Sequence, residues 1–282
     1  MRIVLGLLVT LYGLTALAEI PVNAEPTTVR EVILEKGLLP DAMVIERAND
    51  DGYLIAGRIS QTKSAWATKT DSSGNVVWRY LLGSTVEPSL ADARPVFRGA
   101  AGTDEAKTLL CGSLGTDQSG NVIIDGVVVV LDREGKHVKK QVVAPLPSGE
   151  IAHLAYFKKC AGWGDGFVAV GDVWRYFETG QPQRRKELYH WIVEFDRTGT
   201  IRWQRLMQPK LPSIATYSPI RVMSNQDILV AATSNTDTEV IRLSRSGEVR
   251  ASTTVPRRRA LVQPSADDED VKLLGCYGIP GR

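Results

Sequence analysis

The sequence predicts an all-β protein, a β-propeller of four-stranded antiparallel blades, and three observations lead to that prediction. A tight turn that closes with a glycine recurs four times along the chain. A strand pattern stands on each side of every such turn, and a further apolar strand ending in a small residue precedes each hairpin. An open stack of β-sandwiches is the alternative, because strand patterns alone do not prove that the sheets close into a ring.

The recurring turns share a polar first residue and a glycine at the fourth position. The polar side chain accepts a backbone N–H, and the glycine takes the positive φ that closes the turn. The four turns are Asp71–Gly74, Asp132–Gly135, Asp196–Gly199 and Ser244–Gly247. Tryptophans occupy two equivalent positions around the first and third of these turns. Trp66 and Trp191 lie five residues before the turn Asp, and Trp78 and Trp203 lie four residues after the turn Gly.

The strands upstream of these hairpins end in small residues at regular intervals. These residues are Gly57, Gly112, Gly171 and Ala232, which lie 55, 59 and 61 residues apart. We expect a small residue there to let neighbouring sheets approach closely. Turn signals and a short strand pattern come before the first, third and fourth of these strands, and we therefore expect each unit to hold four strands joined as a meander.

The two ends of the chain supply incomplete units. Val29–Leu34 resembles the last strand of a blade, whereas Ala260–Gln263 and Val271–Cys276 resemble the first two strands of one. Together they would complete a fifth blade from both termini and remove two open sheet edges. We therefore expect five blades; a ragged or larger assembly is the alternative.

The first residues have the plan of a secretory signal peptide. Arg2 precedes an apolar run over Ile3–Leu17, which ends in small residues at positions 16 and 18. The run is shorter than the ~20 residues that a membrane-spanning helix needs. We expect cleavage after Ala18, or alternatively after Ala24, to leave 25–282 as a single propeller domain without a transmembrane segment. The expected location is periplasmic or extracellular.

Charge and cysteine content narrow the classes of partner. The net charge of +2 becomes +1 without residues 1–18, so the protein has no overall field to attract nucleic acid. Cys111, Cys160 and Cys276 are an odd number of cysteines. In an oxidising compartment two of them could pair, and the sequence does not say which. The slightly favoured alternative is that all three cysteines are small, buried, apolar residues.

The segment Ala67–Trp78, ATKTDSSGNVVW, carries a resemblance to a known family. It resembles the A-x-D-x-x-T-G-x-x-x-W repeats of quinoprotein-like (PQQ-like) propellers and similar repeats of secreted bacterial propellers. The third unit repeats the end of the motif as Asp196, Gly199 and Trp203. The resemblance implies that the turn and the tryptophan dock one blade against the next. The chain has neither the adjacent cysteine pair nor the metal ligands of the enzymatic members, so no quinone cofactor is expected.

No motif for catalysis or metal binding stands out. His137, His153 and His190 form no H-x-H or H-x-x-x-H pair, and the sequence contains no P-loop or nucleophile elbow. The segment from Asp117 to Asp125 spaces oxygen ligands as a calcium loop does, but it lacks the glycine and glutamate positions of an EF-hand. A polar loop is the better interpretation, and we predict no catalytic residue, cofactor or metal ligand.

The connections that differ between units are the predicted place for binding. Four long connections would emerge on one face: Gly83–Arg94, Ser113–Asp125, Asp172–Glu187 and Gln208–Tyr217. The third of them is rich in aromatic and arginine residues, which are enriched at binding hot spots. The candidate binding residues are Trp174, Arg175, Tyr176, Phe177, Arg184 and Arg185. Alternatively, Trp174 and Phe177 cover the blade edge and the basic run is simply solvated.

These observations lead to a functional hypothesis with two alternatives. The hypothesis is a non-enzymatic, exported binding or scaffold protein that engages a protein or glycan, one that could be anionic, through the long-loop face. A second basic run, Arg257–Arg259, would make that face more cationic. The first alternative is a hydrolase or lyase acting on saccharide at the propeller axis, with Glu46 as its clearest acid. The second is an immunity or inhibitor protein of a secreted toxin.

Overall fold

The structure is a computed structural model. It describes residues 40–48, 50–83, 87, 90, 93–103, 107–118, 121–145, 152–177, 185–211, 216–217, 220–256, 260–264 and 271–275. Every element with described bounds is a β-strand, which confirms the all-β prediction. The expected signal peptide and the strand expected over Val29–Leu34 lie outside the described residues, as does Cys276. No helix of the described part is long and apolar enough to cross a membrane.

The first sheet is a four-stranded antiparallel meander in the order β1-β2-β3-β4. Its strands are β1 (Pro40–Arg47), β2 (Tyr53–Ile59), β3 (Ser64–Thr70) and β4 (Val76–Leu82). The predicted turn joins β3 to β4: the Asp71 side chain accepts the N–H of Asn75 at 2.8 Å, and Gly74 has a φ of 85°. Every residue of β3 is buried, whereas β4 is largely exposed at the sheet edge.

The middle of the chain forms one eight-stranded sheet. Its strands are β5 (Ala93–Gly102), β6 (Thr108–Gln118), β7 (Asn121–Leu131), β8 (His137–Val143), β9 (Ala152–Trp163), β10 (Gly166–Phe177), β11 (Arg185–Phe195) and β12 (Ile201–Met207). The strands β5–β8 make one antiparallel meander and β9–β12 make another. A parallel pairing of β7 with β9, at Ile124 and Leu154, joins the two meanders into one sheet.

The last part of the chain forms two smaller sheets. The larger contains β13 (Thr216–Tyr217), β14 (Arg221–Val222), β15 (Ile228–Thr233), β16 (Asp237–Leu243) and β17 (Val249–Pro256). The short strands β13 and β14 both pair with β15, so together they occupy the place of one first strand. The strands β18 (Ala260–Pro264) and β19 (Val271–Gly275) pair with each other as a separate two-stranded sheet.

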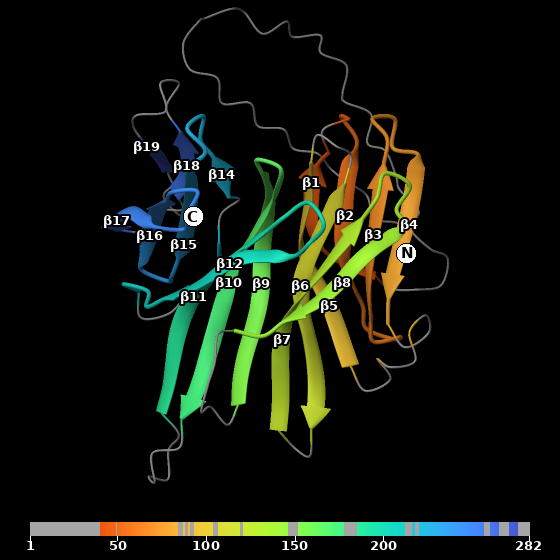
Figure 1. Ribbon diagram of the computed structural model, residues 1–282, viewed down its shortest axis with the longest axis horizontal. Coiled ribbons are helices and arrows are strands. Elements are labelled where there is room, and N and C mark those ends of the chain that lie inside the picture. The colour runs from red at the N-terminus through yellow and green to blue at the C-terminus, as the bar shows by residue number, and fades with distance from the viewer. Residues whose placement is uncertain are drawn as a thin grey trace, which may run out of the picture.

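The predicted propeller of separate four-stranded blades is wrong. The four-stranded meanders exist, but the second and third share one mixed, open sheet. Figure 1 shows the first sheet and the last sheet on opposite sides of the eight-stranded sheet, with no ring closing between them. In the described part of the chain, β18 and β19 form no composite fifth blade. The local pattern of turns and strands determines each meander, whereas its packing against other meanders depends on long-range contacts.

Two of the predicted long loops are mostly strand. In place of a loop over Ser113–Asp125, β6 continues to Gln118 and pairs it with Asn121 of β7. In place of a loop over Asp172–Glu187, β10 continues to Phe177, which pairs with Arg185 of β11. Both hairpins extend from the same end of the eight-stranded sheet (Figure 1). The extension brings the start of β7 beside the start of β9 and so permits the parallel pairing.

Apolar layers fill the spaces between successive meanders. Phe97 and Leu110 face the first sheet in one cluster, Phe157 and Trp191 join another between β5–β8 and β9–β12, and a third lies between β9–β12 and the last sheet. The rings of Phe157 and Trp191 stack with centroids 4.3 Å apart. The core is therefore divided among the seams between meanders.

Two turn glycines, Gly135 and Gly247, pack against a tryptophan of the preceding meander, whereas Gly199 packs against Val130. A Cβ atom on Gly135 would lie 2.5 Å from Cγ of Trp78, and one on Gly247 would lie 3.0 Å from the ring of Trp203. Both glycines also have positive φ, which other residues rarely adopt. In these two places the contact between tryptophan and turn joins neighbouring meanders of an open assembly.

Candidate functional site

Three β-bulges at equivalent positions direct side chains toward one region. The register of each first strand against its second shifts by one residue at Met43 in β1, Arg98 in β5 and Lys158 in β9. A bulge inserts one extra residue and re-aims its side chain. Arg98 Nη1 lies 3.9 Å from Met43 Sδ, so the bulges of β1 and β5 bring their side chains together.

The small residues of the second strands make these bulges sterically feasible. Gly57, Gly112 and Gly171 each lie beside a first-strand carbonyl two residues before the bulge, and a Cβ atom on any of them would overlap that oxygen. The sequence pattern predicts that such residues admit a neighbouring sheet. The structure corrects this: the close approach is within each sheet, between its first two strands.

Tyr156 lies between two cations. The Arg98 guanidinium carbon is 5.9 Å from the centre of the Tyr156 ring, and Lys158 Nζ is 5.7 Å from the same centre. Contacts of this length are cation–π interactions. Met43, Arg98, Tyr156 and Lys158 are called the bulge cluster below. Burial, aided by the nearby Asp172 carboxylate, raises the pKa of Tyr156, so its hydroxyl stays protonated at neutral pH.

Arg98 is incompletely satisfied. Its Nε is buried and has no hydrogen-bond partner, and no carboxylate of the described residues forms an ion pair with it. Burial lowers the pKa of Arg98 from its usual value, although the nearby Tyr156 opposes that effect. A guanidinium remains charged in proteins. The site therefore contains a half-buried cation with one unused donor, the covered Nε.

A buried polar chain extends from Lys158 to Glu239 across the seam with the last sheet. Lys158 Nζ pairs with the Asp172 carboxylate, and the Tyr217 hydroxyl lies 2.7 Å from Asp172 Oδ1. The same hydroxyl lies 2.8 Å from His190 Nδ1, and His190 Nε2 lies 3.1 Å from Glu239. Asp172, His190, Tyr217 and Glu239 are each at most 4% exposed.

The protons of this chain are constrained by its geometry. A tyrosine hydroxyl carries one proton, and that of Tyr217 has the Gly171 carbonyl at 2.8 Å as a further acceptor. The Tyr217 hydroxyl therefore has three neighbours for its one proton, which are the Gly171 carbonyl, the Asp172 carboxylate and His190 Nδ1.

Hydrogen bonding controls the ionisation of Glu239. Burial alone would raise the pKa of this carboxyl, but it accepts from His190, from the backbone N–H of Lys210 at 2.8 Å and from the Ser252 hydroxyl at 3.0 Å. Together these bonds hold its pKa below the usual value. Burial and the nearby Asp172 charge raise the pKa of Tyr217 well above its usual value.

Glu46, the acid singled out from the sequence, lies on β1 and is half-buried. Its carboxylate is 3.8 Å from Lys159 Nζ. Burial raises the pKa of Glu46, and the charges of Lys159 and Arg221 only partly offset that effect. These residues come from the first strands of three different sheet units, which therefore converge here.

A cationic hollow of about 290 Å³ lies between the β2–β3 turn and β5. Its described lining residues are Arg58, Ile59, Ser60, Lys63, Ser64, Arg94, Pro95 and Val96. Three of these are basic and none is acidic, although Arg58 also pairs with Asp41 at its rim, at 3.0 Å. The charge of Arg58 also acts on Arg98, so the hollow and the bulge cluster are electrostatic neighbours.

The structure brings some of the predicted binding residues into this region. Trp174 donates a hydrogen bond to Tyr156, and Tyr176 is close enough to influence the same hydroxyl. The side chain of Arg175 lies on the opposite face of β10, where its guanidinium carbon is 5.1 Å from the centre of the Tyr189 ring. Phe177 and Arg185 are strand residues whose side chains are not described, and Arg184 and the basic run Arg257–Arg259 lie outside the described residues.

The other residues considered for chemistry are dispersed. His137 is exposed and stacks with Tyr80 at 6.4 Å, and His153 lies on β9 with an undescribed side chain. Asp117 and Asp125 belong to the β6–β7 hairpin, which replaces the predicted polar loop. Within the described residues, no cluster of His, Cys, Asp or Glu could hold a metal ion.

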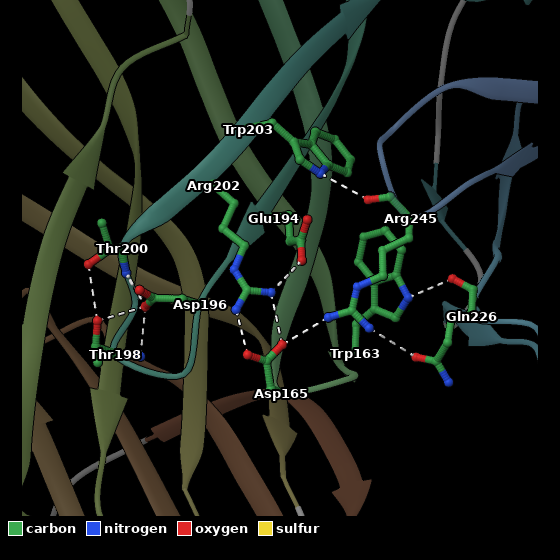
Figure 2. A network of polar contacts seen from close by, with 10 residues as sticks. All are labelled: Trp163, Asp165, Glu194, Asp196, Thr198, Thr200, Arg202, Trp203, Gln226 and Arg245. Atoms are coloured by element: carbon green, nitrogen blue, oxygen red, sulfur yellow. Dashed lines mark hydrogen bonds and ion pairs between the residues drawn. The ribbon is translucent and has the colours of Figure 1, made fainter.

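A second polar network lies at the β9–β10 turn and is structural. Asp165 accepts hydrogen bonds from Arg202 at 2.6 and 2.9 Å and from Arg245 at 2.8 Å. Arg202 also donates to the buried Glu194 at 3.0 Å. Figure 2 shows that Arg245 reaches this network from the last sheet and lies over Trp163. The network joins two sheets through groups that satisfy one another.

Comparisons with known proteins give no family. No family model and no curated protein matches the chain. Among solved structures, a luciferin-regenerating enzyme is 12% identical with a TM-score of 0.41, and the match covers 80% of this chain. The chain spans 66% of the length of that structure. A likeness at this level carries no argument about the activity of this protein.

Sequence reasoning missed Arg98, Tyr156 and Lys158. Tyr156 and Lys158 lie in a segment that was predicted only as a short first strand, and Arg98 lies in a segment for which no strand was predicted. The sequence of a single strand does not predict a bulge. The spacing gave no exact signal either, because Arg98 stands 14 residues before Gly112 and Lys158 stands 13 residues before Gly171.

Proposed function

We propose that this protein is a non-enzymatic, exported binding protein that captures an anionic glycan or protein segment at the bulge cluster. The observation that carries the proposal is Arg98, whose half-buried guanidinium has a buried Nε without an acceptor. Leaving such a donor unsatisfied costs about 1–3 kcal/mol. A carboxylate or sulfate on a ligand would supply the acceptor once the Arg98 side chain turns its covered Nε toward it, and a guanidinium binds such groups through two parallel hydrogen bonds.

The surroundings of Arg98 support an extended ligand. Tyr156, Trp174 and Tyr176 provide adjacent aromatic surfaces, and rigid aromatic side chains supply contact area at low entropic cost. The cationic hollow beside Arg58 offers a second place for negative charge. An acidic polymer could contact both regions, whereas a small neutral ligand would leave Arg98 unsatisfied.

Titration calorimetry with defined polymers tests this function. The polymers are polygalacturonate as an acidic glycan, polyglutamate as an acidic polypeptide and dextran as a neutral glycan. We expect an acidic polymer to bind, more weakly as salt is added, and dextran not to bind. Arg98→Met should weaken the Kd about 10- to 100-fold, because it removes a charge-assisted hydrogen bond of about 1.5–3 kcal/mol.

The control is Arg133→Met, which removes the same charge from an exposed turn. Arg98→Met should melt no lower than the wild type, because removal of the unsatisfied Nε offsets the loss of the contacts with Tyr156 and Met43. Equal binding of dextran and the acidic polymers, or equal affinity of Arg98→Met and wild type, would contradict the proposal.

A second candidate, a saccharide-acting enzyme, is favoured by Glu46 alone. Its raised pKa suits a general acid. Glycoside hydrolysis ordinarily needs a second carboxyl across the scissile bond. Asp172 and Glu239 are already held within the buried polar chain. Binding is therefore the preferred function, and turnover of polygalacturonate that disappears in Glu46→Gln would instead establish the enzyme.

A further inference from the structure

Two cysteines from different meanders lie together in the seam of the eight-stranded sheet. Cys111 belongs to β6 and Cys160 to β9, and both are buried with reduced thiols. Gly99 marks the place where they approach. A Cβ atom there would lie 2.6 Å from Cys111 Sγ and 2.9 Å from the backbone nitrogen of Cys160. The missing side chain of Gly99 thus leaves the space that the Cys111 sulfur occupies beside Cys160.

The two thiols also interact directly. The Cys160 thiol is hydrogen-bonded to that of Cys111, and its sulfur lies 3.8 Å from the carbonyl oxygen of Leu109. The other members of this seam are apolar side chains, including Phe157 and Trp191. Burial and the Cys111 hydrogen bond raise the pKa of Cys160 well above its usual value. The folded protein therefore keeps Cys160 as a thiol, and both cysteines are buried away from solvent.

We propose that Cys111 and Cys160 form a disulfide bond that staples the meander β5–β8 to the meander β9–β12 when the chain folds in an oxidising medium. The oxidant is a small-molecule disulfide such as oxidised glutathione. One cysteine thiolate attacks it and releases one glutathione thiol, and the second cysteine then displaces the other. The two cysteine sulfurs lose two electrons and two protons, and both glutathione sulfurs end as thiols.

The timing of the reaction follows from burial. Only thiolates attack disulfides, and both sulfurs are covered in the folded seam. The bond therefore forms while the seam is still open during folding. The disulfide should stabilise the folded protein strongly, because it closes a loop of about fifty residues between β6 and β9. We expect the oxidised protein to melt about 5–10 °C above the reduced protein.

The experiment refolds the chain without its first 24 residues in a glutathione redox buffer. Remaining thiols are alkylated after denaturation, and peptides are mapped by mass spectrometry. We expect a Cys111–Cys160 cross-linked peptide, with neither cysteine alkylated, in the wild type and in Cys276→Ser. Cys111→Ser should leave Cys160 alkylated, and Cys160→Ser should leave Cys111 alkylated.

The wild-type map decides the question even where a variant fails to fold. Alkylation of both cysteines, glutathione left on either one, or a cross-link from either to Cys276 would overturn the proposal. A Cys111–Cys160 cross-link that does not raise the melting temperature above that of the reduced protein would contradict the proposed stabilising role of the disulfide. Binding of acidic polymers is a separate readout, so this result is independent of the proposed function.

Discussion

The hydroxyl of Tyr217 lies 2.8 Å from Nδ1 of His190 and 2.7 Å from Oδ1 of Asp172, and all three side chains are buried. One proton donor of the last sheet thus lies between a histidine and a carboxylate of the eight-stranded sheet. Because β13 has two residues, this contact contributes much of what holds it beside β10 and β11.

Tyr217→Phe removes that hydroxyl and nothing else. Asp172 keeps Lys158 but loses its second donor, and His190 Nδ1 is left facing a ring. We expect a loss of about 2–3 kcal/mol in the free energy of unfolding, measured in urea. Tyr53→Phe, in the first sheet, is the matched control and should change stability by less than about 0.5 kcal/mol. Equal losses in the two variants would contradict a bridging role.

Glu239 makes the free energy of unfolding depend on pH. Its pKa is lower in the folded than in the unfolded protein, so its interactions stabilise the fold above the unfolded pKa of about 4 and are lost as the pH falls through the folded value. We therefore expect Glu239→Gln to be destabilised most at neutral pH, with a difference from wild type that shrinks below about pH 4. Urea unfolding across pH measures it, with exposed Glu134→Gln as control. A difference that grows toward acid would refute this interpretation.

Gly112→Ala tests the bulge geometry. The new methyl group would overlap the carbonyl oxygen of Val96, so β5 must shift and Arg98 must move with it. We expect a loss of at least about 2 kcal/mol and a weaker response to acidic polymers. The control lies on the same strand: a Cβ atom on Gly115 would meet Ile124 at an ordinary 3.8 Å. Gly115→Ala should stay within about 1 kcal/mol of wild type, and a similar loss in both would argue against the bulge as the cause.

Substitution of Arg202 and of Arg245 compares the contribution of a buried ion pair to stability with that of an exposed ion pair. Arg202→Met leaves Glu194, which is 2% exposed, without its cation, and we expect a loss of about 3–5 kcal/mol. Arg245→Met removes the pair with the exposed Asp165 together with the contacts to Trp163 and Gln226, and it should cost about 1–2 kcal/mol, less than Arg202→Met. Thermal and urea unfolding of both variants give the comparison. Similar losses would mean that the network acts as one unit.

The elements that sequence predicts best are those governed by nearest neighbours. The turns at Asp71, Asp132 and Asp196 form as expected, because an aspartate that accepts a backbone N–H and a glycine with positive φ suffice to define them. The four-strand meanders follow from those turns. Nothing in these local rules determines how one meander lies against another.

The prediction of the fold failed where contacts between residues far apart in the sequence determine which strands pair. The pairing of Ile124 with Leu154 depends on the lengths of two hairpins, and polar segments such as Asp117–Asp125 look like loops until a partner strand is present. The site shows the same division. Trp174 and Tyr176 were found from composition, whereas Arg98 and Lys158 required the bulges to be seen.

The parallel pairing of β7 with β9 limits how this chain can vary. Units of a repeat protein ordinarily touch through side chains alone, so single units can be duplicated or lost. Here the second and third units share a backbone contact, and deleting either would expose a bare strand edge of the other. These two units must be inherited together, and under mechanical load they should rupture in a single event.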